Sequence, residues 1–480
     1  MWIFLNIYEA PFFTVPCGLQ ATSRKQNMRS TSVNILHQSL ISPSPLSSGE
    51  VRPSLPLTFF DLIWINYSPV ERLFFYQFPY PTSHFLDFHL PIFKSSLSVA
   101  LSTFYPLAAT IRRRQSDGRF EIATTDSDSV TLTVSEYEGA AADFLDISGD
   151  HSRPVEKLLV LIPRLPISRE EQPLLAVQVT LFPNYGLCLA LAVHHAACDG
   201  FSSMQFVKLW SAAAASGLRL DRLNPGLPAP VMDRTVIPDP RNVYLQIEKG
   251  VLDERAKEKM VTSGISGGVF AATLSISAPE IDRLKKRVQG RAAEQGMRRF
   301  HCSSFVISLA YSWTCMLKTR CITDGDGAAH VLFAVDWRRR IRPEIPANYY
   351  GNCLAPCYVK CKAEELLAKD GILVASAAIG TGIEELGDDV HEIIDGLMDR
   401  IGELAPWRPL TVAGSPKMGV YETDFGWGKP RKVEVISTRE TGAVALAESR
   451  DGEGGIEIGV ILPEEDLKAF AKHFAAGRDW

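Results

Sequence analysis

The sequence predicts a soluble α/β protein of two domains, and three observations lead to this class. Its 480 residues are too many for one ordinary core, which favours two domains. Apolar runs typical of buried strands alternate with segments of helical periodicity on both sides of residues 221–245. That interval carries five prolines and no periodicity, so we expect a linker there.

The first half of the chain predicts a helix followed by several strands. Leu97, Leu101 and Phe104 recur at helical spacing, so a helix should end before Pro106. A hairpin loop is expected at 183–186, because it separates two apolar runs. Both runs are almost entirely apolar, which indicates a sheet covered on its two faces. The strands are expected over residues 130–134, 158–163, 174–182 and 187–193.

After Gly200 the pattern changes from strand to helix. Met204, Val207 and Trp210 recur every three residues, and Gly217 closes the segment. The sequence thus predicts a strand, a tight turn and a helix in succession. Beyond the linker, helices are expected over 278–289, 303–320, 464–476 and, with breaks, 363–404, and a strand over 330–337.

Charge and composition exclude several partners. The net charge is −5 and the longest basic runs are short triplets, which argues against nucleic acid. No apolar stretch is long enough to span a bilayer, so we expect no membrane partner. Nine scattered cysteines suit reduced core thiols in a cytoplasmic protein better than a disulfide framework.

Residues 1–27 differ from the rest of the chain. They are apolar at the start but lack the basic region of a secretory signal. We interpret them as a non-native or mispredicted extension, poorly ordered, with Met28 as a plausible start. A targeting segment is the alternative.

The stretch HHAACDG, residues 194–200, ends the apolar run of 187–193. The ordinary pKa of histidine, about 6.5, would let His195 act as a general base near neutrality. The carboxylate of Asp199 could hold the turn by pairing with an arginine from elsewhere, and Gly200 permits a tight exit into the helix. Taken alone, the pattern is a weak signal and favours a structural histidine.

Metal binding and two other chemistries are alternatives to this hypothesis. His194, His195, Cys198 and Asp199 are possible metal ligands, but they share one short turn and no distant Cys/His pair matches them, so no metal is expected. GISGG at 264–268 does not follow the apolar strand that a hydrolase elbow requires. The DFG of 424–426 lacks every other kinase motif.

A second notable stretch is DFGWGKP, residues 424–430. A glycine-rich surface turn is one interpretation. However, Phe425 and Trp427 would be costly to expose, and the glycines indicate close approach of the backbone.

Together, HHAACDG and DFGWGKP resemble the two motifs of the plant BAHD acyltransferases, which move acyl groups from coenzyme A thioesters onto alcohols or amines. The resemblance covers nearly all of residues 28–480. Residues 32–45 resemble the first strand of that family. Further segments resemble the subgroup that acylates anthocyanin, flavonoid and simpler phenolic glycosides, often with malonyl-CoA: 55–79, 233–240, 348–353 and 442–462.

The resemblance implies a two-lobed fold like that of chloramphenicol acetyltransferase, with a solvent channel between the lobes. The N-terminal lobe would comprise residues 28–220, with 424–449 crossing back to it. The C-terminal lobe would comprise 246–423 and 450–480, with 221–245 as the crossover linker. A monomer is expected.

The resemblance also implies roles for individual residues. His195 would lie in the channel and take the proton from an acceptor hydroxyl while its oxygen attacks the thioester. Acyl-CoA, malonyl-CoA first, would be a co-substrate, with no permanently bound cofactor. Trp427 is a candidate oxyanion donor or channel residue. Structural roles are implied for Asp199, for Gly200, for Arg338 as the partner of Asp199, and for Asp424, Gly426 and Gly428.

The acyl donor is less well specified than the reaction. Phe201 stands where several malonyl-using members carry a basic residue, although a malonyl carboxylate requires a cationic partner. Arg164 and Lys208 are the candidate donor-binding residues. A hydroxycinnamoyl or acetyl donor is the main alternative within the family. Outside it, a non-catalytic homologue acting as a binding module and a thioester hydrolase are the alternatives.

Overall fold

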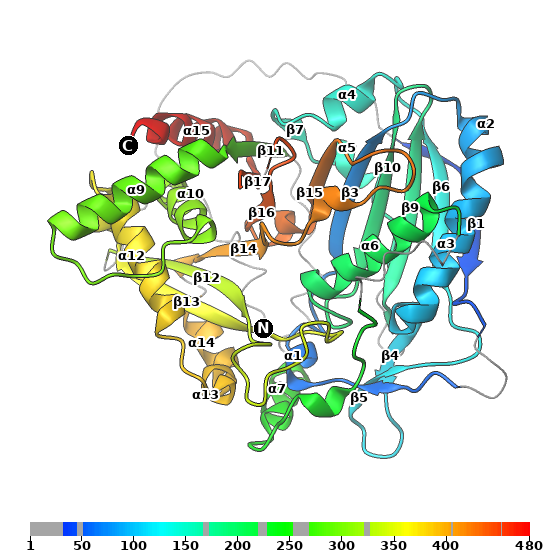
Figure 1. Ribbon diagram of the computed structural model, residues 1–480, viewed down its shortest axis with the longest axis horizontal. Helices are drawn as coiled ribbons and strands as arrows, with labels where there is room; N and C mark the ends of the chain where they lie inside the picture. Colours follow the sequence, from blue (N-terminus) through cyan, green and yellow to red (C-terminus); the bar gives the residue numbers. More distant parts are fainter. Residues whose placement is uncertain are drawn as a thin grey trace.

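Three β-sheets organise the chain in the computed structural model (Figure 1). The structure describes residues 32–45, 51–166, 172–218, 228–252, 268–320, 327–404, 407–452 and 454–480. The expected extension over 1–27 therefore lies outside the described residues, as does most of the GISGG stretch.

The first large sheet has six strands in the order β1-β6-β9-β10-β3-β15. Its centre is the hairpin of β9 and β10, whose residues are all buried, because the two runs are apolar at almost every position. This confirms the strands and the loop predicted there. The strands are β1 (Val33–Ile41), β3 (Val70–Gln77), β6 (Val130–Tyr137), β9 (Leu175–Phe182), β10 (Gly186–Val193) and β15 (Lys432–Val435).

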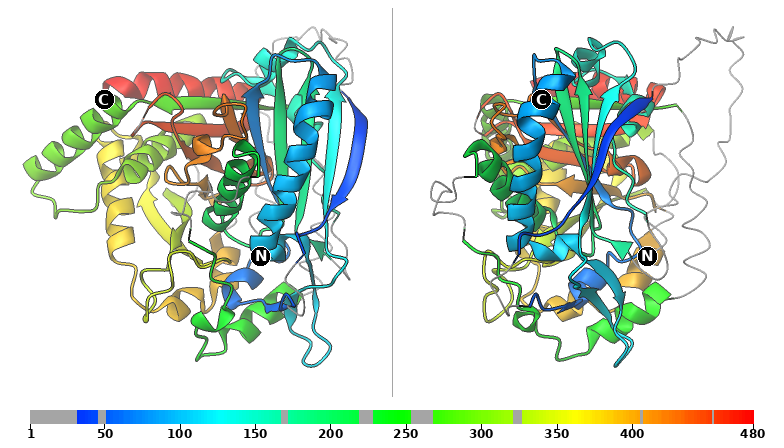
Figure 2. Two further views of the ribbon diagram at one scale, coloured as in Figure 1. Left: turned by 45° about the vertical axis from the view of Figure 1, so that its right-hand side comes forward. Right: turned by 90° about the vertical axis from the view of Figure 1, so that its right-hand side faces the viewer.

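Two long helices, α3 (Leu90–Thr103) and α6 (Gly200–Ala215), cover one face of this sheet (Figures 1 and 2). The rings of Phe93 and Trp210 lie 4.6 Å apart where the two helices touch. The smaller elements around the sheet are α1 (Phe59–Leu62), α2 (Thr82–His84), η1 (Phe85–His89), η2 (Tyr105–Ala108), α4 (Asp143–Ile147) and α5 (Glu156–Leu159). A four-stranded sheet lies beside them: β2 (Leu55–Pro56), β5 (Phe120–Ala123), β4 (Thr110–Arg113) and β8 (Gln172–Pro173).

The second large sheet has seven strands in the order β13-β12-β14-β16-β17-β11-β7. Helix α10, which is buried along most of its length, packs among the helices of this lobe. The strands are β7 (Arg153–Pro154), β11 (Val269–Ile276), β12 (Ala328–Asp336), β13 (Leu354–Lys362), β14 (Leu410–Gly414), β16 (Val444–Glu448) and β17 (Ile456–Pro463). The helices are α9 (Ala278–Glu294), α10 (Ser304–Arg320), α11 (Ala363–Leu367), α12 (Gly371–Glu384), α13 (Val390–Ile394), α14 (Leu397–Leu404) and α15 (Glu464–Ala476), with short turns η6 (Val420–Glu422), η7 (Ser437–Glu440) and η8 (Gly477–Asp479).

The two large sheets exchange short strands. β15 pairs antiparallel with β3 in the first sheet, whereas β7 pairs with β11 in the second. The expected crossing of 424–449 is thus seen for β15, but β16 pairs with β14 and β17 and belongs to the second sheet. The segment that crosses to the first lobe therefore ends before β16, and not at residue 449 as expected.

The strand predicted over 158–163 is wrong. The segment begins in α5 and continues as turns, in which the backbone N–H of Leu161 donates to the carbonyl of Leu158 at 3.1 Å. Leu158 and Leu161 are buried while Leu159 is only partly buried, which is the spacing of a helical turn. A short apolar run does not by itself distinguish the two conformations.

The expected linker is packed against both lobes where it is described. Val231 forms a β-bridge with Tyr349, and Arg234 lies in a short 3-10 turn, η4 (Arg234–Val236), with its side chain buried. Helix α7 (Val243–Leu252) then packs against α1. The proline-rich composition correctly indicated a segment without regular periodicity. It gave no information about how closely that segment packs against the two lobes.

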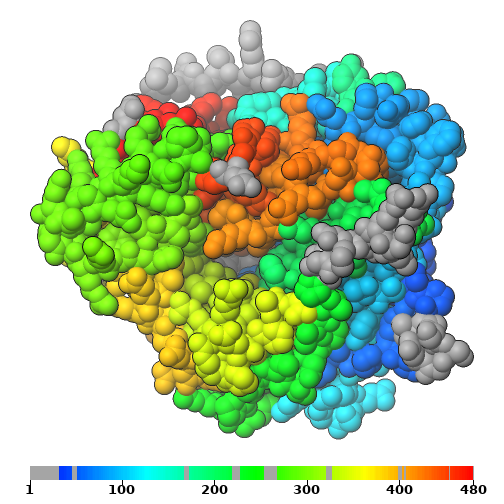
Figure 3. Space-filling view, viewed as in Figure 1, coloured from blue at the N-terminus to red at the C-terminus, as the bar shows by residue number. Residues whose placement is uncertain are grey.

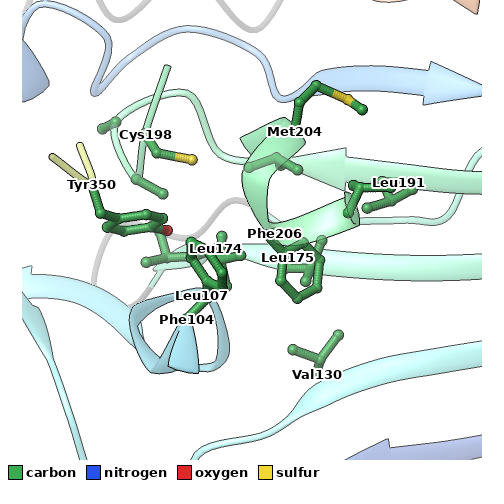
Figure 4. Packing of buried hydrophobic residues seen from close by; sticks show 14 of the residues in the cluster. Phe104, Leu107, Val130, Leu174, Leu175, Leu191, Cys198, Met204, Phe206 and Tyr350 are labelled. Atoms are coloured by element: carbon green, nitrogen blue, oxygen red, sulfur yellow. The ribbon is translucent and has the colours of Figure 1, made fainter. Parts of the chain in front are cut away.

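The hydrophobic core of the first lobe extends beneath the HHAACDG turn. Figure 4 shows Cys198 and Tyr350 beside Leu107 and Phe104. The ring of Tyr350, from the second half of the chain, lies 5.7 Å from that of Phe104. The two halves of the sequence therefore share one core at this turn. All cysteines of the described residues are free, and no helix among those residues has the length and apolarity needed to cross a membrane.

Candidate active site

The HHAACDG turn connects the central strand β10 to helix α6. β10 ends at Val193, and α6 begins at Gly200. The carboxylate of Asp199 caps the helix by accepting the backbone N–H of Ser202 at 2.9 Å. The turn is therefore fixed at one end by the sheet and at the other by the helix.

His194 has a structural role. Its Nε2 donates to Oε1 of Gln172 at 2.7 Å, and its Nδ1 accepts the backbone N–H of Ala196 at 3.2 Å. Burial lowers the pKa of His194 to about 4, and the neighbouring His195 acts in the same direction. This imidazole is therefore neutral near pH 7, with both nitrogens engaged.

His195 is partly exposed, unlike its neighbour. Its ring stacks on Trp64 at a centroid distance of 3.9 Å and an interplanar angle of 8°. Burial lowers the pKa of His195, opposed by its own backbone carbonyl, the charge of Asp199, a hydrogen bond from the ring to the Asn352 side chain, and the charge of Asp61. The ring is therefore neutral near pH 7 and held in one plane, as a proton acceptor should be.

A network from the second half of the chain fixes the backbone of this histidine. The side-chain Nδ2 of Asn352 donates to the carbonyl of His195 at 2.9 Å and to Oδ1 of Asp61 at 3.0 Å. Asp61 is fully buried, and its Oδ2 also accepts the backbone N–H and the hydroxyl of Thr58, at 2.9 and 2.8 Å. Every link in this chain therefore helps to orient the His195 turn.

A buried ion pair fixes the other side of the turn. Nη2 of Arg338, just after β12, lies 2.7 Å from Oδ2 of Asp199, and both side chains are almost fully buried. The same nitrogen donates to the carbonyls of Tyr349 and Gly351 at 3.2 and 3.3 Å. The structure thus contains the expected pairing of Asp199 with Arg338, and the carboxylate points away from His195 toward the second lobe.

His195 consequently lies where the two lobes meet. Its strand belongs to the first sheet, whereas Arg338 and Asn352 flank strands of the second. Figure 3 shows the surface hollowed at the centre of one face, where the orange segment, the green one that includes α6 and the yellow one meet. Among the described residues, no group of three or more His, Cys, Asp and Glu side chains could hold a metal ion.

The DFGWGKP stretch forms a tight loop around its first residue. Oδ1 of Asp424 accepts the backbone N–H groups of Gly426 at 2.7 Å and of Gly428 at 2.9 Å. Both glycines have positive φ, +92° and +86°, which other residues adopt only with strain. The three residues thus shape the backbone, consistent with the structural role expected of them.

Trp427 is not placed as an oxyanion donor. Its indole N–H points to Nδ1 of His89 at 3.1 Å. Its ring packs against those of Tyr76 and Phe78 in an aromatic cluster inside the first lobe.

The strand register separates this cluster from the catalytic turn. In the pairing of β3 with β10, Val70 lies opposite Val193, next to His195, whereas Gln77 lies opposite Gly186. Seven residues of extended strand span roughly 20 Å or more. The indole therefore lies at the other end of the sheet from His195, and the sequence prediction for it is corrected.

The two predicted acyl-donor residues are not suitably placed either. Nζ of Lys208, on α6, lies 2.6 Å from Oε2 of Glu422, so its charge is already balanced. Arg164 is exposed in the segment after α5. Neither offers an unpaired cation inside the structure, and their role in donor binding stays a prediction.

Sequence reasoning missed three residues that hold the histidine: Asp61, Trp64 and Asn352. All three lie in stretches that resemble the BAHD subgroup, 55–79 and 348–353. A local signal existed at Thr58 and Asp61, which form a capping box at the start of α1. Their proximity to the turn, however, is a long-range contact that spacing alone does not reveal.

Comparisons with known proteins agree on one family. Residues 31–476 match the Transferase family. Phenolic glucoside malonyltransferase 2 of Arabidopsis thaliana is 34% identical over 435 residues, or 88% of this chain and 94% of that protein. The malonyl-coenzyme A:anthocyanin 3-O-glucoside-6''-O-malonyltransferase of Dahlia pinnata is 34% identical over 462 residues, or 93% of this chain and 97% of that protein.

Solved structures share the fold at lower identity. Vinorine synthase matches with a TM-score of 0.68 and 20% identity, covering 91% of this chain and 96% of that one. F. graminearum TRI101, complexed with coenzyme A and T-2 mycotoxin, matches with a TM-score of 0.60 and 16% identity over 87% and 96% of the two chains. The chain therefore has their two-lobed, chloramphenicol acetyltransferase-like α/β fold, and it belongs to the Transferase family, that of the plant BAHD acyltransferases, as an acyltransferase.

Proposed function

We propose that the chain transfers an acyl group, malonyl in the first instance, from coenzyme A to a hydroxyl of a phenolic, flavonoid or anthocyanin glycoside. The observation that carries this proposal is the setting of His195: a neutral, partly exposed imidazole at the junction of the lobes. The relatives that name malonyl-coenzyme A and glucosides support the choice of donor and acceptor.

His195 acts as the general base in this proposal. Its Nδ1 is buried and the ring interacts with its own backbone carbonyl, so the proton of the neutral ring belongs on Nδ1. Nε2 then accepts the proton of the acceptor hydroxyl while the oxygen attacks the thioester carbonyl. The tetrahedral intermediate collapses, the C–S bond breaks, and the departing thiolate of coenzyme A takes the proton from His195.

The supporting residues position this base rather than react. The stacked indole of Trp64 fixes the plane of the ring, and Asn352 fixes the carbonyl of His195. Asp199 and Arg338 hold the turn between strand and helix. Coenzyme A and the acceptor would reach His195 from opposite mouths of a channel between the lobes, so that no covalent acyl-enzyme is needed.

Similarity to a coumaroyltransferase supports a second class of acyl donor. Agmatine coumaroyltransferase of Arabidopsis thaliana is 31% identical over 462 residues, covering 92% of this chain and 98% of that protein. A hydroxycinnamoyl donor is therefore the alternative within the same reaction.

The experiment is a donor-by-acceptor matrix. Purified protein is incubated with malonyl-, acetyl- or coumaroyl-CoA and a panel of phenolic and flavonoid glucosides, and the products are identified by mass. The proposal predicts malonylated glucoside as the main product. Release of free coenzyme A at the same rate without any acceptor would indicate a hydrolase, and absence of turnover with every donor would indicate a binding module.

A further inference from the structure

An arginine without an acidic partner lies buried between the two lobes. Arg72, on β3, is 7% exposed. Its Nη2 has a weak contact at 3.9 Å with the sulfur of Met418, and its Nε is buried with no hydrogen-bond partner. Among the described residues, no carboxylate oxygen lies within the 4.0 Å that would make an ion pair with this guanidinium.

Such an arrangement is costly unless something binds there. A guanidinium carries five N–H donors, and leaving a buried charged group unsatisfied destabilises a fold more than the loss of an ordinary hydrogen bond. Buried charges in proteins are otherwise paired. The burial lowers the pKa of Arg72 to about 10, which leaves it cationic near neutral pH.

Arg72 lines a small cavity of about 40 Å³ between the first and second sheets. The other two charged residues of the lining are acids that are already neutralised. Glu434 lies 2.5 Å from Arg153, and Glu457 lies 2.7 Å from Arg450. The remaining lining is rich in small residues: Ala271, Ala272, Gly414, Ala445, Ala447 and Gly459. The cavity therefore offers a compact space with one unneutralised positive charge.

The strand register places Arg72 at the catalytic end of the first sheet. It lies opposite Leu191 of β10, four positions before His195. Met418, which contacts the guanidinium, also packs against Gly200, where a Cβ would approach the methionine methyl group to 2.6 Å. Met418, which lines the cavity, therefore connects it to Gly200 at the start of α6.

We propose that Arg72 is a donor-specificity residue, whose guanidinium binds the free carboxylate of a malonyl group while the thioester faces His195. Arginine and a carboxylate form two parallel charge-assisted hydrogen bonds, a geometry that an acetyl group cannot offer. This inference rests on the proposed function and supplies the cationic partner that neither Arg164 nor Lys208 provides.

A structural role is the competing explanation. Glu448 influences Arg72 electrostatically, and its Oε2 is buried without a hydrogen-bond partner. Arg72 would then balance this acid and support the interface between the sheets. A structural arginine would affect every donor alike, whereas a carboxylate-binding arginine would affect malonyl-CoA selectively.

The test compares malonyl-CoA with acetyl-CoA, which has the same thioester and no carboxylate. For Arg72→Gln, kcat/KM with malonyl-CoA should fall about 10- to 100-fold, the change expected on losing a charge-assisted hydrogen bond. With acetyl-CoA it should change far less. Arg72→Lys keeps the charge but not the paired geometry, so its ratio of kcat/KM for malonyl-CoA to kcat/KM for acetyl-CoA should lie between those of the wild type and Arg72→Gln. This second variant keeps the test valid if Arg72→Gln fails to fold.

Arg439→Gln is the matched control. This buried arginine pairs with Glu71, the neighbour of Arg72 on β3, so its loss should leave the malonyl-to-acetyl ratio unchanged. If the wild-type protein uses malonyl-CoA and Arg72→Gln lowers kcat/KM equally for both donors, the role of Arg72 is overturned while the proposed function stands. A wild-type protein that transfers acetyl or coumaroyl but not malonyl groups would overturn the proposed donor and this inference together.

Discussion

Asp199 and Arg338 form a buried ion pair that joins the two lobes at the catalytic turn, with Oδ2 and Nη2 2.7 Å apart. Asp199 caps helix α6, while Arg338 follows β12 of the second sheet. Because the carboxylate is engaged on this side, it influences the ring of His195 through its charge. The pair sets where the ring lies relative to the second lobe.

Substituting Asp199 by alanine should therefore damage both stability and activity. Removing one partner leaves a buried uncompensated charge on Arg338, which costs about 3–5 kcal/mol of unfolding free energy. Turnover should fall because the turn is misplaced. Urea unfolding and steady-state kinetics would measure the two effects.

Asp117→Ala provides the control for that substitution. Its pair with Arg114 is exposed and screened by solvent, so its loss should change stability far less than the loss of Asp199. Normal turnover by Asp199→Ala would refute the structural role of the pair.

The pH dependence of the reaction should report His195. The residue acts as a base only when neutral, so activity is lost as the pH falls through its pKa. Because burial lowers that pKa from 6.5, the acid limb of kcat/KM should lie below pH 6.5. Acetyl-CoA is the suitable donor for the measurement, because its acyl group does not titrate. An acid limb above pH 7 would be incompatible with an imidazole whose pKa is lowered by its surroundings.

Asn352→Ala should lower kcat with little effect on KM for acyl-CoA. The variant removes the side-chain bonds to the His195 carbonyl and to Oδ1 of Asp61, while the backbone N–H of residue 352 still donates to that carboxylate oxygen. Misplacement of a catalytic group by about 1 Å can cost about 100-fold in rate. Pre-steady-state kinetics would locate the loss, and a raised KM with unchanged kcat would show that Asn352 acts in binding.

Trp427→Phe should be nearly silent in catalysis. Loss of an oxyanion donor typically costs about 100- to 1000-fold in kcat. The indole N–H instead points to His89, so the expected effect is a stability loss of about 0.5–1.5 kcal/mol. A fall in kcat of about 100-fold with unchanged thermal stability would restore Trp427 to the active site.

Local sequence patterns predicted the parts of the site that are close in the chain. The apolar run of β10, the polar turn and the helical spacing after Gly200 all lie within 30 residues, and each was predicted in place. The final helix, α15, begins and ends at the predicted residues 464 and 476. In these segments, periodicity and capping act locally, so the sequence alone contains the information.

The contacts that complete the site are long-range, and spacing does not encode them. Asp61 and Asn352 are separated by 291 residues, yet they share a hydrogen bond beside His195. Arg72 lies in a largely apolar strand, and its burial depends on residues of the second sheet that are distant in the chain. The motif around Trp427 was noticed for its composition, but only the strand register shows that it lies at the far end of the sheet.

The most direct test of the account is the activity of His195→Ala with the best acyl donor and acceptor. A missing general base should lower kcat by about 100-fold or more, while the variant unfolds at the wild-type temperature and still binds acyl-CoA. His194→Asn, which alters the structural neighbour, provides the comparison, because it should lower stability more than it lowers kcat. Turnover by His195→Ala close to that of the wild-type protein would contradict the assignment of this imidazole as the catalytic base.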